Sequence, residues 1–146
     1  MIFKEEKRNL LSVDANEYYF AQCISANYAM ATEIIDNFDT GYNMKNAITE
    51  QKENVVESPD KSCLLVNNKV FNLIVKQSYS QKASYESLKK SLIGMKLIML
   101  KYTGIIDKSK LAMPKICSNE LEWDKVKEII KEVFQDTNLE ILVCFL

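Results

Sequence analysis

The sequence predicts an α/β fold, in which a mixed central sheet lies between two layers of helices. Short apolar runs alternate along the chain with longer amphipathic stretches, as strands and helices do in layered α/β proteins. The strand-like runs are apolar at most positions, so both faces of the sheet need cover. The length of 146 residues suits one hydrophobic core, and we expect a single domain over residues 1–146.

Seven segments have the length and composition of strands. They are residues 1–3, 9–13, 18–24, 62–66, 70–76, 110–116 and 140–145. The run CLLVNNKVFNLIVK predicts a hairpin with Asn67 and Asn68 at its turn, because Asn tolerates the left-handed backbone that such turns need. The polar stretch 53–61 is the only linker-like segment, and it is too short to separate domains.

Four segments are expected as helices: residues 32–38, 43–52, 84–102 and 120–134. Ser84 is a candidate cap for the third helix, and Asn119 with Glu122 has the spacing of a capping box for the fourth. The faces expected to point inward carry Tyr85, Leu88, Leu92, Met95 and Met99 in the third helix, and Trp123, Val126, Ile130 and Val133 in the fourth.

Composition excludes several kinds of site. The chain has no histidine, which rules out a Ser-His-Asp triad, a Cys-His dyad and any zinc site that contains histidine. The net charge of −1 and the single arginine, Arg8, do not indicate a nucleic-acid-binding surface. We therefore expect no metal, no cofactor and no nucleic-acid partner.

The four cysteines, at 23, 63, 117 and 144, are too far apart in sequence for a CxxC unit. We interpret them as small buried hydrophobes in a reducing compartment. Charges interrupt the N-terminal MIFKEEKRNLL, and no apolar run approaches the roughly 20 residues that span a bilayer. A cytoplasmic protein that does not engage membranes is expected.

The stretch ISANYAMATEIIDNF raises a specific question about phosphate binding. It reads as the end of a strand, a tight turn and the start of a helix. Nucleotide-binding folds place a phosphate at such a turn and use glycine there, so that the backbone can approach it. Here the turn carries Ala31, Thr32 and Glu33 instead.

Four blocks together resemble a macro domain: QCISANYAMATEI, LIVKQSYSQKASYESLKKSL, AMPKICSNELEW and the final apolar run to Leu146. More narrowly, they are similar to the small branch of terminal ADP-ribose protein glycohydrolases. The resemblance spans essentially the whole chain, and the middle block is its most specific part. It implies a three-layer α/β/α macro-domain-like fold, with an ADP-ribose pocket at the carboxyl ends of the strands and hydrolysis of ADP-ribosyl esters.

The resemblance implies a catalytic role for Lys76, which matches the lysine that attacks the anomeric carbon in this branch. The alternative is a solvated lysine leaving a strand. The family's catalytic aspartate has no counterpart, because the segment after Pro114 is about two residues shorter and lacks aspartate and glycine. Glu120 could replace the aspartate if its side chain turns inward, whereas Asn119 cannot act as an acid or base.

The resemblance also implies a set of ligand-binding residues. Asn9 would accept a hydrogen bond from the adenine amino group, although a surface turn is the favoured alternative. Ser25 matches a serine near the distal ribose, and the alternative is a polar residue that simply ends a strand. The full set is Asn9, Leu10, Ser25, Met30, Ala31, Thr32, Glu33, Ile34, Pro114, Cys117, Ser118, Asn119 and Leu146.

Both phosphate-binding loops of the family have lost their glycines here, and the chain holds only three glycines in all. Each loss restricts positive φ, and the Glu33 carboxylate would compete with a diphosphate at the helix start. We expect a monomer that recognises ADP-ribose or an ADP-ribosylated protein, with glycohydrolase activity reduced or absent. The alternatives are a non-enzymatic degenerate macro domain that acts as an interaction module or inhibitor, and a pocket reshaped for another nucleotide.

Overall fold

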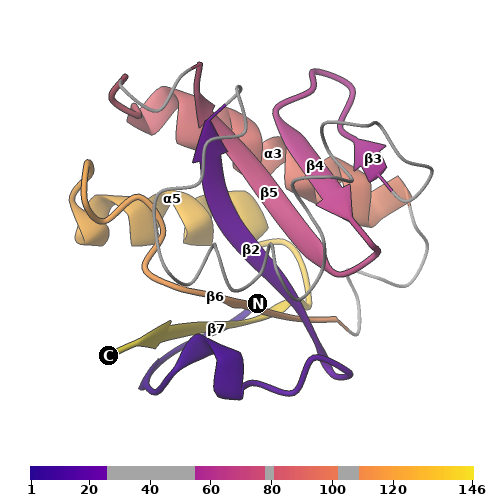
Figure 1. Ribbon diagram of the computed structural model, residues 1–146, viewed down its shortest axis with the longest axis vertical. Coiled ribbons are helices and arrows are strands. Elements are labelled where there is room, and N and C mark those ends of the chain that lie inside the picture. Colours follow the sequence, from indigo (N-terminus) through magenta and orange to yellow (C-terminus); the bar gives the residue numbers. More distant parts are fainter. Residues whose placement is uncertain (26–54, 78–80, 102–108) are drawn as a thin grey trace.

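The computed structural model describes residues 1–25, 55–77, 81–101 and 109–146. These residues form a seven-stranded sheet with the order β1-β7-β6-β2-β5-β4-β3, together with two α-helices and one short 3-10 helix (Figure 1). In chain order the elements are β1 (Ile2–Lys7), η1 (Leu10–Ser12), β2 (Tyr18–Ser25), β3 (Val55–Glu57), β4 (Cys63–Val66), β5 (Val70–Lys76), α3 (Tyr85–Lys101), β6 (Lys110–Met113), α5 (Trp123–Phe134) and β7 (Glu140–Phe145).

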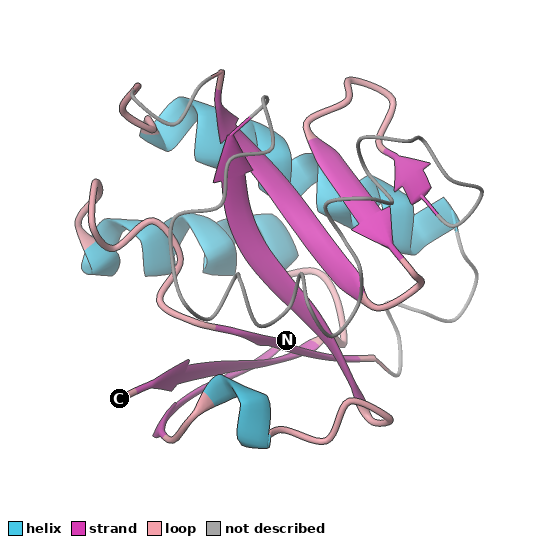
Figure 2. Cartoon of the chain, in the orientation of Figure 1, coloured by secondary structure: helices cyan, strands magenta, loops and turns pink. Residues whose placement is uncertain are grey.

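The sheet is mixed, as the sequence predicts. Strands β1, β7, β6, β2 and β5 are parallel neighbours, and β4 and β3 continue the sheet in antiparallel pairing (Figure 2). All five parallel strands therefore end at the same edge of the sheet. Open α/β sheets bind their ligands outside the carboxyl ends of the strands, which makes this edge the place to look for a site.

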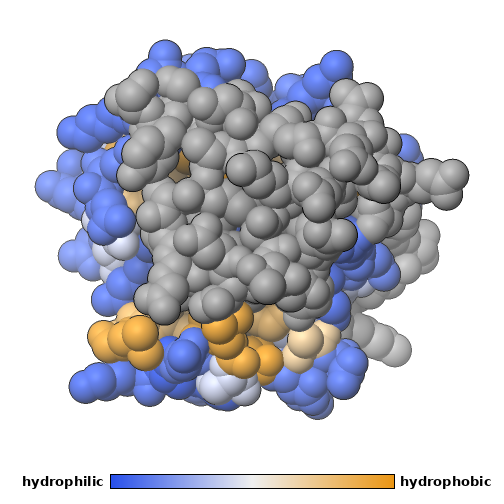
Figure 3. Space-filling model, viewed as in Figure 1, coloured by the Kyte–Doolittle hydropathy of each residue, from blue (hydrophilic) through white to orange (hydrophobic). Residues whose placement is uncertain are grey.

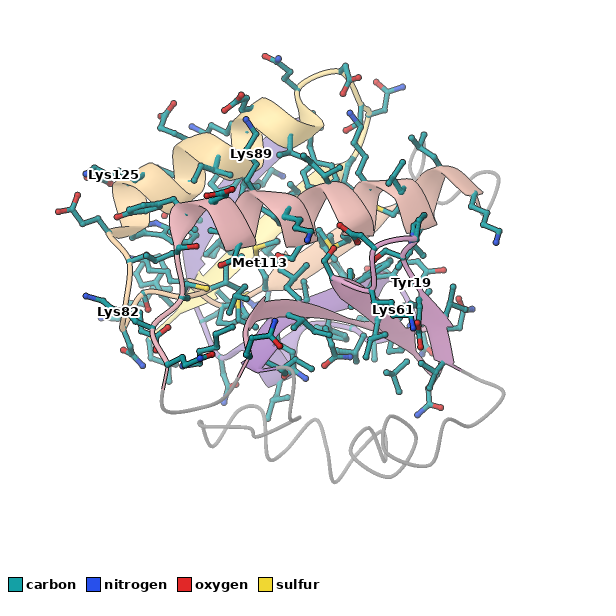
Figure 4. The ribbon with its side chains drawn as sticks, turned by 90° about the horizontal axis from the view of Figure 1, so that it is seen from above. Tyr19, Lys61, Lys82, Lys89, Met113 and Lys125 are labelled. Carbon is teal, nitrogen blue, oxygen red and sulfur yellow. The ribbon has the colours of Figure 1, made fainter. Side chains whose placement is uncertain are left out.

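Helices α3 and α5 pack against each other and lie on the same face of the sheet (Figure 4). The core between the sheet and these helices contains Leu88, Leu92, Met95, Met113 and Ile130, each fully buried. The other face has an apolar core of its own, built around Leu10, Phe20, Val66 and Val70. Both faces are thus apolar, as a three-layer α/β/α fold requires, while the helices expected over 32–38 and 43–52 lie outside the described residues.

Several expected elements are confirmed closely. Strands β2, β5 and β7 cover the segments expected at 18–24, 70–76 and 140–145. Asn67 and Asn68 have φ of 55° and 51° between the antiparallel β4 and β5, the left-handed backbone foreseen for that hairpin. Helix α3 begins directly after Ser84, whose Oγ accepts a hydrogen bond from the Ser87 N–H at 3.1 Å.

One strand prediction and the linker interpretation are wrong. The segment expected as a strand at 9–13 instead contains the 3-10 helix η1 (Leu10–Ser12), because the Asn9 side chain accepts a hydrogen bond from the Leu11 N–H and so caps a turn. The polar stretch 53–61, interpreted as linker-like, contains strand β3, which pairs with β4 along the edge of the sheet. Strand β3 has only three residues, between charged and turn-forming neighbours, so its sequence is too short to show the alternation typical of strands.

Other element boundaries also differ. Strand β1 runs to Lys7 rather than ending at residue 3. Strand β6 ends at Met113 rather than at 116, because Pro114 has no N–H to donate to a neighbouring strand. Helix α5 begins at Trp123, with Glu122 as an N-cap that makes no side-chain capping bond. The capping box expected from Asn119 and Glu122 is therefore wrong, and residues 114–122 form an irregular turn. None of the described helices has the length and apolar character needed to span a membrane.

Candidate functional site

The carboxyl edge of the sheet gathers predicted site residues from five separate stretches of the chain. Asn9 and Leu10 follow β1, Leu146 follows β7, Pro114 follows β6, Ser25 ends β2 and Lys76 ends β5. Ser25 and Lys76 are register partners between the parallel β2 and β5. The order of strands thus arranges these residues along one edge, with Asn9 at one end and Lys76 at the other.

Lys76 and Glu120 form an ion pair at this edge. The distance between Lys76 Nζ and Glu120 Oε1 is 2.6 Å, and the two side chains are only 12% and 28% exposed. The other oxygen, Glu120 Oε2, accepts a hydrogen bond of 3.0 Å from the backbone N–H of Ala83, just before α3. The carboxylate is thus held from two sides, with its first oxygen directed at the amine.

The surroundings of Glu120 favour its charged form. Burial alone would raise the pKa of this carboxyl group, but the hydrogen bonds from Lys76 and Ala83 and the charges of Lys76 and Lys82 outweigh burial. The net result is a pKa below the ordinary value of 4.5, so Glu120 is a carboxylate at neutral pH. A carboxylate in contact with an amine can accept a proton from it.

The short turn after β6 explains why Glu120, rather than Asn119, reaches Lys76. Cys117 has a left-handed backbone with φ of 58°, uncommon for a residue that is not glycine. Its carbonyl oxygen accepts hydrogen bonds from the N–H groups of Glu120 at 3.1 Å and Leu121 at 2.8 Å. This reversal places Ser118 and Asn119 in solvent and turns Glu120 toward the sheet.

Cys117 also contacts a second cysteine. Its Sγ lies 3.0 Å from the Sγ of Cys23 in β2, and both are free thiols. The interpretation of every cysteine as a plain buried hydrophobe fits Cys63 and Cys144, but it misses this pair. The two residues are 94 positions apart, so nothing in their spacing reveals the contact.

The opposite end of the edge is apolar. Leu10 is buried, whereas Leu11 and Leu146 are 44% and 82% exposed. Figure 3 shows apolar surface gathered at the lower part of this face, over η1 and the end of β7. The Arg8 N–H donates a hydrogen bond of 2.9 Å to the Phe145 carbonyl, which joins the two strand ends. The Asn9 side-chain oxygen already accepts from Leu11 at 2.9 Å, within η1.

One predicted segment of the site lies outside the described residues. Met30, Ala31, Thr32, Glu33 and Ile34, which make up the glycine-free turn, lie outside the described residues. Ser25 is the last residue of β2. The parts of the chain that are described contain no group of three potential metal-ligating side chains. An open groove of about 310 Å³ lies elsewhere, on the outer side of α3 and α5, and is lined by residues such as Ile93, Leu97 and Leu100.

Solved structures identify the class of protein. The macrodomain of Mycobacterium tuberculosis DarG superposes with a TM-score of 0.72 at 14% identity, covering 99% of this chain and 98% of that one. The macrodomain of Thermus aquaticus DarG gives 0.69 at 14% identity, with the same coverage. Thermosipho africanus DarTG, solved in complex with ADP-ribose, gives 0.59 at 14% identity over 90% of this chain and 39% of that one. The fold is that of a macrodomain.

Sequence relatives are more specific. Human ADP-ribose glycohydrolase OARD1 is 34% identical over 127 residues, which cover 84% of this chain and 78% of the human protein. Bovine OARD1 is 43% identical over 76 residues. This match covers 51% of this chain and 47% of the bovine protein, so here the chain spans about half the length of its relative. No protein-family model matches the chain. The chain belongs to the macrodomain family of the ADP-ribose glycohydrolase OARD1.

Proposed function

We propose that this macrodomain binds ADP-ribose, or ADP-ribose attached to a protein, along the carboxyl edge of its sheet, and that Lys76 and Glu120 remove the ADP-ribosyl group slowly. The observation that carries the proposal is the 2.6 Å contact between Lys76 Nζ and Glu120 Oε1. It joins the amine that the family resemblance marks as nucleophile to a carboxylate able to take its proton. The relatives named as ADP-ribose glycohydrolases support the same reaction class.

The strand order suggests how an elongated ligand lies. Asn9, Leu10 and Leu146 are at the β1-β7 end, and Lys76 is at the end of β5, four strands away. Four spacings of about 4.8 Å separate the two ends by roughly 19 Å. The adenine ring packs on the apolar end, and the distal ribose reaches Lys76. Pro114, Cys117, Ser118 and Asn119 follow β6 and flank the diphosphate between them.

The first chemical step forms a covalent bond. Lys76 first releases its ion-pair proton to solvent. The neutral amine then attacks the anomeric carbon of the distal ribose, and the bond from that carbon to the ester oxygen of the modified side chain breaks. The modified carboxylate leaves with the electron pair of that bond. Glu120 accepts the proton that the attacking nitrogen loses, so that charge does not build up at the adduct.

The second step restores the enzyme. Water adds to the anomeric carbon and loses one proton to solvent, the bond from that carbon to the Lys76 nitrogen breaks, and free ADP-ribose leaves. Glu120, now protonated, returns its proton to the Lys76 nitrogen. Lys76 then regains its ion-pair proton from solvent, so both residues end in their starting states. The overall reaction is hydrolysis of one ester to a carboxylate, ADP-ribose and one proton.

Weak activity follows from the turn between residues 114 and 122. The N–H groups of Ser118, Glu120 and Leu121 donate to carbonyls within the turn, at 3.3, 3.1 and 2.8 Å, rather than pointing outward. A diphosphate needs free N–H groups, so this turn must open before it can bind one. The missing glycines at 31–33 add a second obstacle.

The same closed turn favours a second candidate function. If the turn does not open, the chain is a non-enzymatic member of the family that acts as a protein-interaction module or inhibitor. In that case the ion pair between Lys76 and Glu120 is a structural link between β5 and the turn.

Calorimetric titration of ADP-ribose into the purified protein decides between the two candidates. AMP and ribose 5-phosphate serve as controls for the two ends of the ligand. Micromolar binding of ADP-ribose, with weaker binding of each fragment, supports the first candidate. Absence of both heat and a thermal shift at millimolar ADP-ribose overturns it and favours the interaction module.

Hydrolysis of an ADP-ribosylated glutamate peptide tests the two residues. Lys76→Ala should lower kcat by at least about 100-fold, and Glu120→Gln by about 10- to 100-fold, because a nucleophile and a proton acceptor contribute such factors. Lys89→Ala is a matched control, since it removes an exposed ion pair with Glu132 on the helical face. Wild-type activity in Lys76→Ala would exclude the mechanism even if ADP-ribose binds.

A further inference from the structure

We propose that Cys23 and Cys117 are a thiol-oxidation site, which a peroxide converts reversibly into a disulfide bond that fastens the turn carrying Glu120 to strand β2. The formation of the disulfide stands on the geometry of the two thiols alone. Its effect on ligand binding rests on the proposed function.

The two sulfur atoms are already placed for the reaction. They lie 3.0 Å apart, and a disulfide requires about 2.0 Å, so a shift of about 1 Å brings them to bonding distance. Both side chains are partly exposed, which admits a small oxidant, whereas Cys63 and Cys144 are buried. Cys117 sits on an irregular turn rather than in a strand, so it can make this shift without disturbing the sheet.

The chemistry assigns a different role to each sulfur. The Cys117 thiol, burial and the Glu120 charge raise the pKa of Cys23, which therefore stays a thiol at neutral pH. Cys117 lies on the turn beside the exposed Ser118, and it is the sulfur that reacts with the peroxide first. It takes one oxygen from the peroxide, which gives a sulfenic acid and water, or an alcohol from an organic peroxide. The Cys23 sulfur then attacks the Cys117 sulfur, the S–S bond forms, and the hydroxyl leaves as water with the Cys23 proton.

The disulfide would affect the candidate site because Cys117 is only three positions before Glu120 in the same turn. The Cys117 carbonyl oxygen accepts hydrogen bonds from the N–H groups of Glu120 and Leu121. In sequence, Cys117 directly precedes the exposed Ser118. A covalent link to β2 at this point keeps the turn closed. Since the proposed function requires the turn to open around a diphosphate, the oxidised protein should bind ADP-ribose more weakly, by about tenfold or more.

Peptide mass mapping without reductant tests the site itself. The reduced protein is treated with hydrogen peroxide, digested and compared with a sample treated afterwards with a thiol reductant. We expect one linked pair of peptides, containing Cys23 and Cys117, that disappears on reduction. Cys144→Ser should leave the link intact and Cys117→Ser should abolish it. Sulfinic acid at Cys117 without a link, or a link through Cys63 or Cys144, would overturn the proposal.

A second measurement separates the site from its effect. The melting temperature of the oxidised protein should rise by roughly 5 °C or more, because the bond closes a long loop. This readout needs no ligand, so it holds even if ADP-ribose does not bind. Calorimetry then compares ADP-ribose binding by both forms. If the reduced form binds and the oxidised form binds equally well, control of the site by oxidation is excluded while the disulfide stands.

Discussion

Glu120 joins three segments of the chain. Its side chain contacts Lys76 at the end of β5 and the Ala83 N–H before α3, while its own backbone belongs to the turn after β6. Each contact involves the charged carboxylate, and charge-assisted hydrogen bonds are stronger than neutral ones. The residue that we assign to proton transfer is therefore also a fastening point of the fold, and its effects on stability and on catalysis have to be measured separately.

Glu120→Gln should reduce the loss of stability in acid. The pKa of Glu120 in the folded protein lies below its ordinary value of 4.5, so the contribution of the pair is present above roughly pH 4.5. That contribution disappears as pH falls through the folded-state pKa. Between about pH 6 and pH 3, the melting temperature of the wild type should therefore fall further than that of Glu120→Gln.

Glu132→Gln is the matched control for this experiment. It breaks an ion pair in which both side chains are more exposed, at 45% and 59%, and such surface pairs contribute little. Its melting temperature should follow the wild type across the same range. Parallel curves for the wild type and Glu120→Gln would show that the carboxylate is not stabilised in the folded state.

At the level of single residues, sequence reasoning predicted Lys76 as the amine of the site but did not reveal which residues it contacts. Lys76 could be identified because a long block around it resembles the family. Glu120 was one of two candidates, and only the left-handed Cys117 decides between it and Asn119. The contact of Cys23 with Cys117 depends on the packing of a turn against a strand, which no local pattern reports.

At the level of elements, Gly94 allows helix α3 to approach the turn at residues 58–62. A Cβ at this position would lie 2.6 Å from Ser62 Oγ and 3.0 Å from Ser58 Oγ. Both hydroxyl groups are already engaged, since each donates to Asp60 Oδ1, at 2.5 and 2.9 Å. Residues 58–62 directly precede β4. The close approach of Gly94 to this turn therefore fixes α3 over the antiparallel part of the sheet.

Gly94→Ala should therefore destabilise the protein. Exposed helix positions usually gain up to about 1 kcal/mol from this change, but overpacking costs about 1–3 kcal/mol. We expect a net loss of about 1–2 kcal/mol, measured by urea unfolding. The double variant Ser62→Ala with Gly94→Ala removes the nearest oxygen and should recover part of the loss. A stabilised Gly94→Ala variant would mean that the turn moves away freely.

The elements that sequence predicted well are those with strong local signals. The hairpin of β4 and β5 follows from two Asn residues between apolar runs, and α3 follows from a cap and a regular apolar stripe. Strand β3 and the start of α5 were missed because pairing with β4, and the shape of the turn before Trp123, decide them. Both depend on contacts between distant residues.

At the level of the whole molecule, we predict a monomer in solution. Strand β1 is outermost in the described sheet and carries four charged residues in succession, Lys4, Glu5, Glu6 and Lys7, all exposed. Charged edge strands disfavour pairing with another sheet. Light scattering at micromolar concentration should give a mass near 16.8 kDa. A mass of twice this value would point to another interface, for which the apolar groove on α3 and α5 is the first candidate.

The pairing of β1 with β7 has a consequence for how the chain folds. Ile2 is the register partner of Glu140, so the two strands nearest the ends of the chain are neighbours. During synthesis β1 cannot pair with β7 until the segments that form the other strands and both described helices have been made. Contacts between such distant segments slow folding, because the long loop must close first. The apolar end of the candidate site, formed by η1 and the end of β7, should therefore be the last part to assemble.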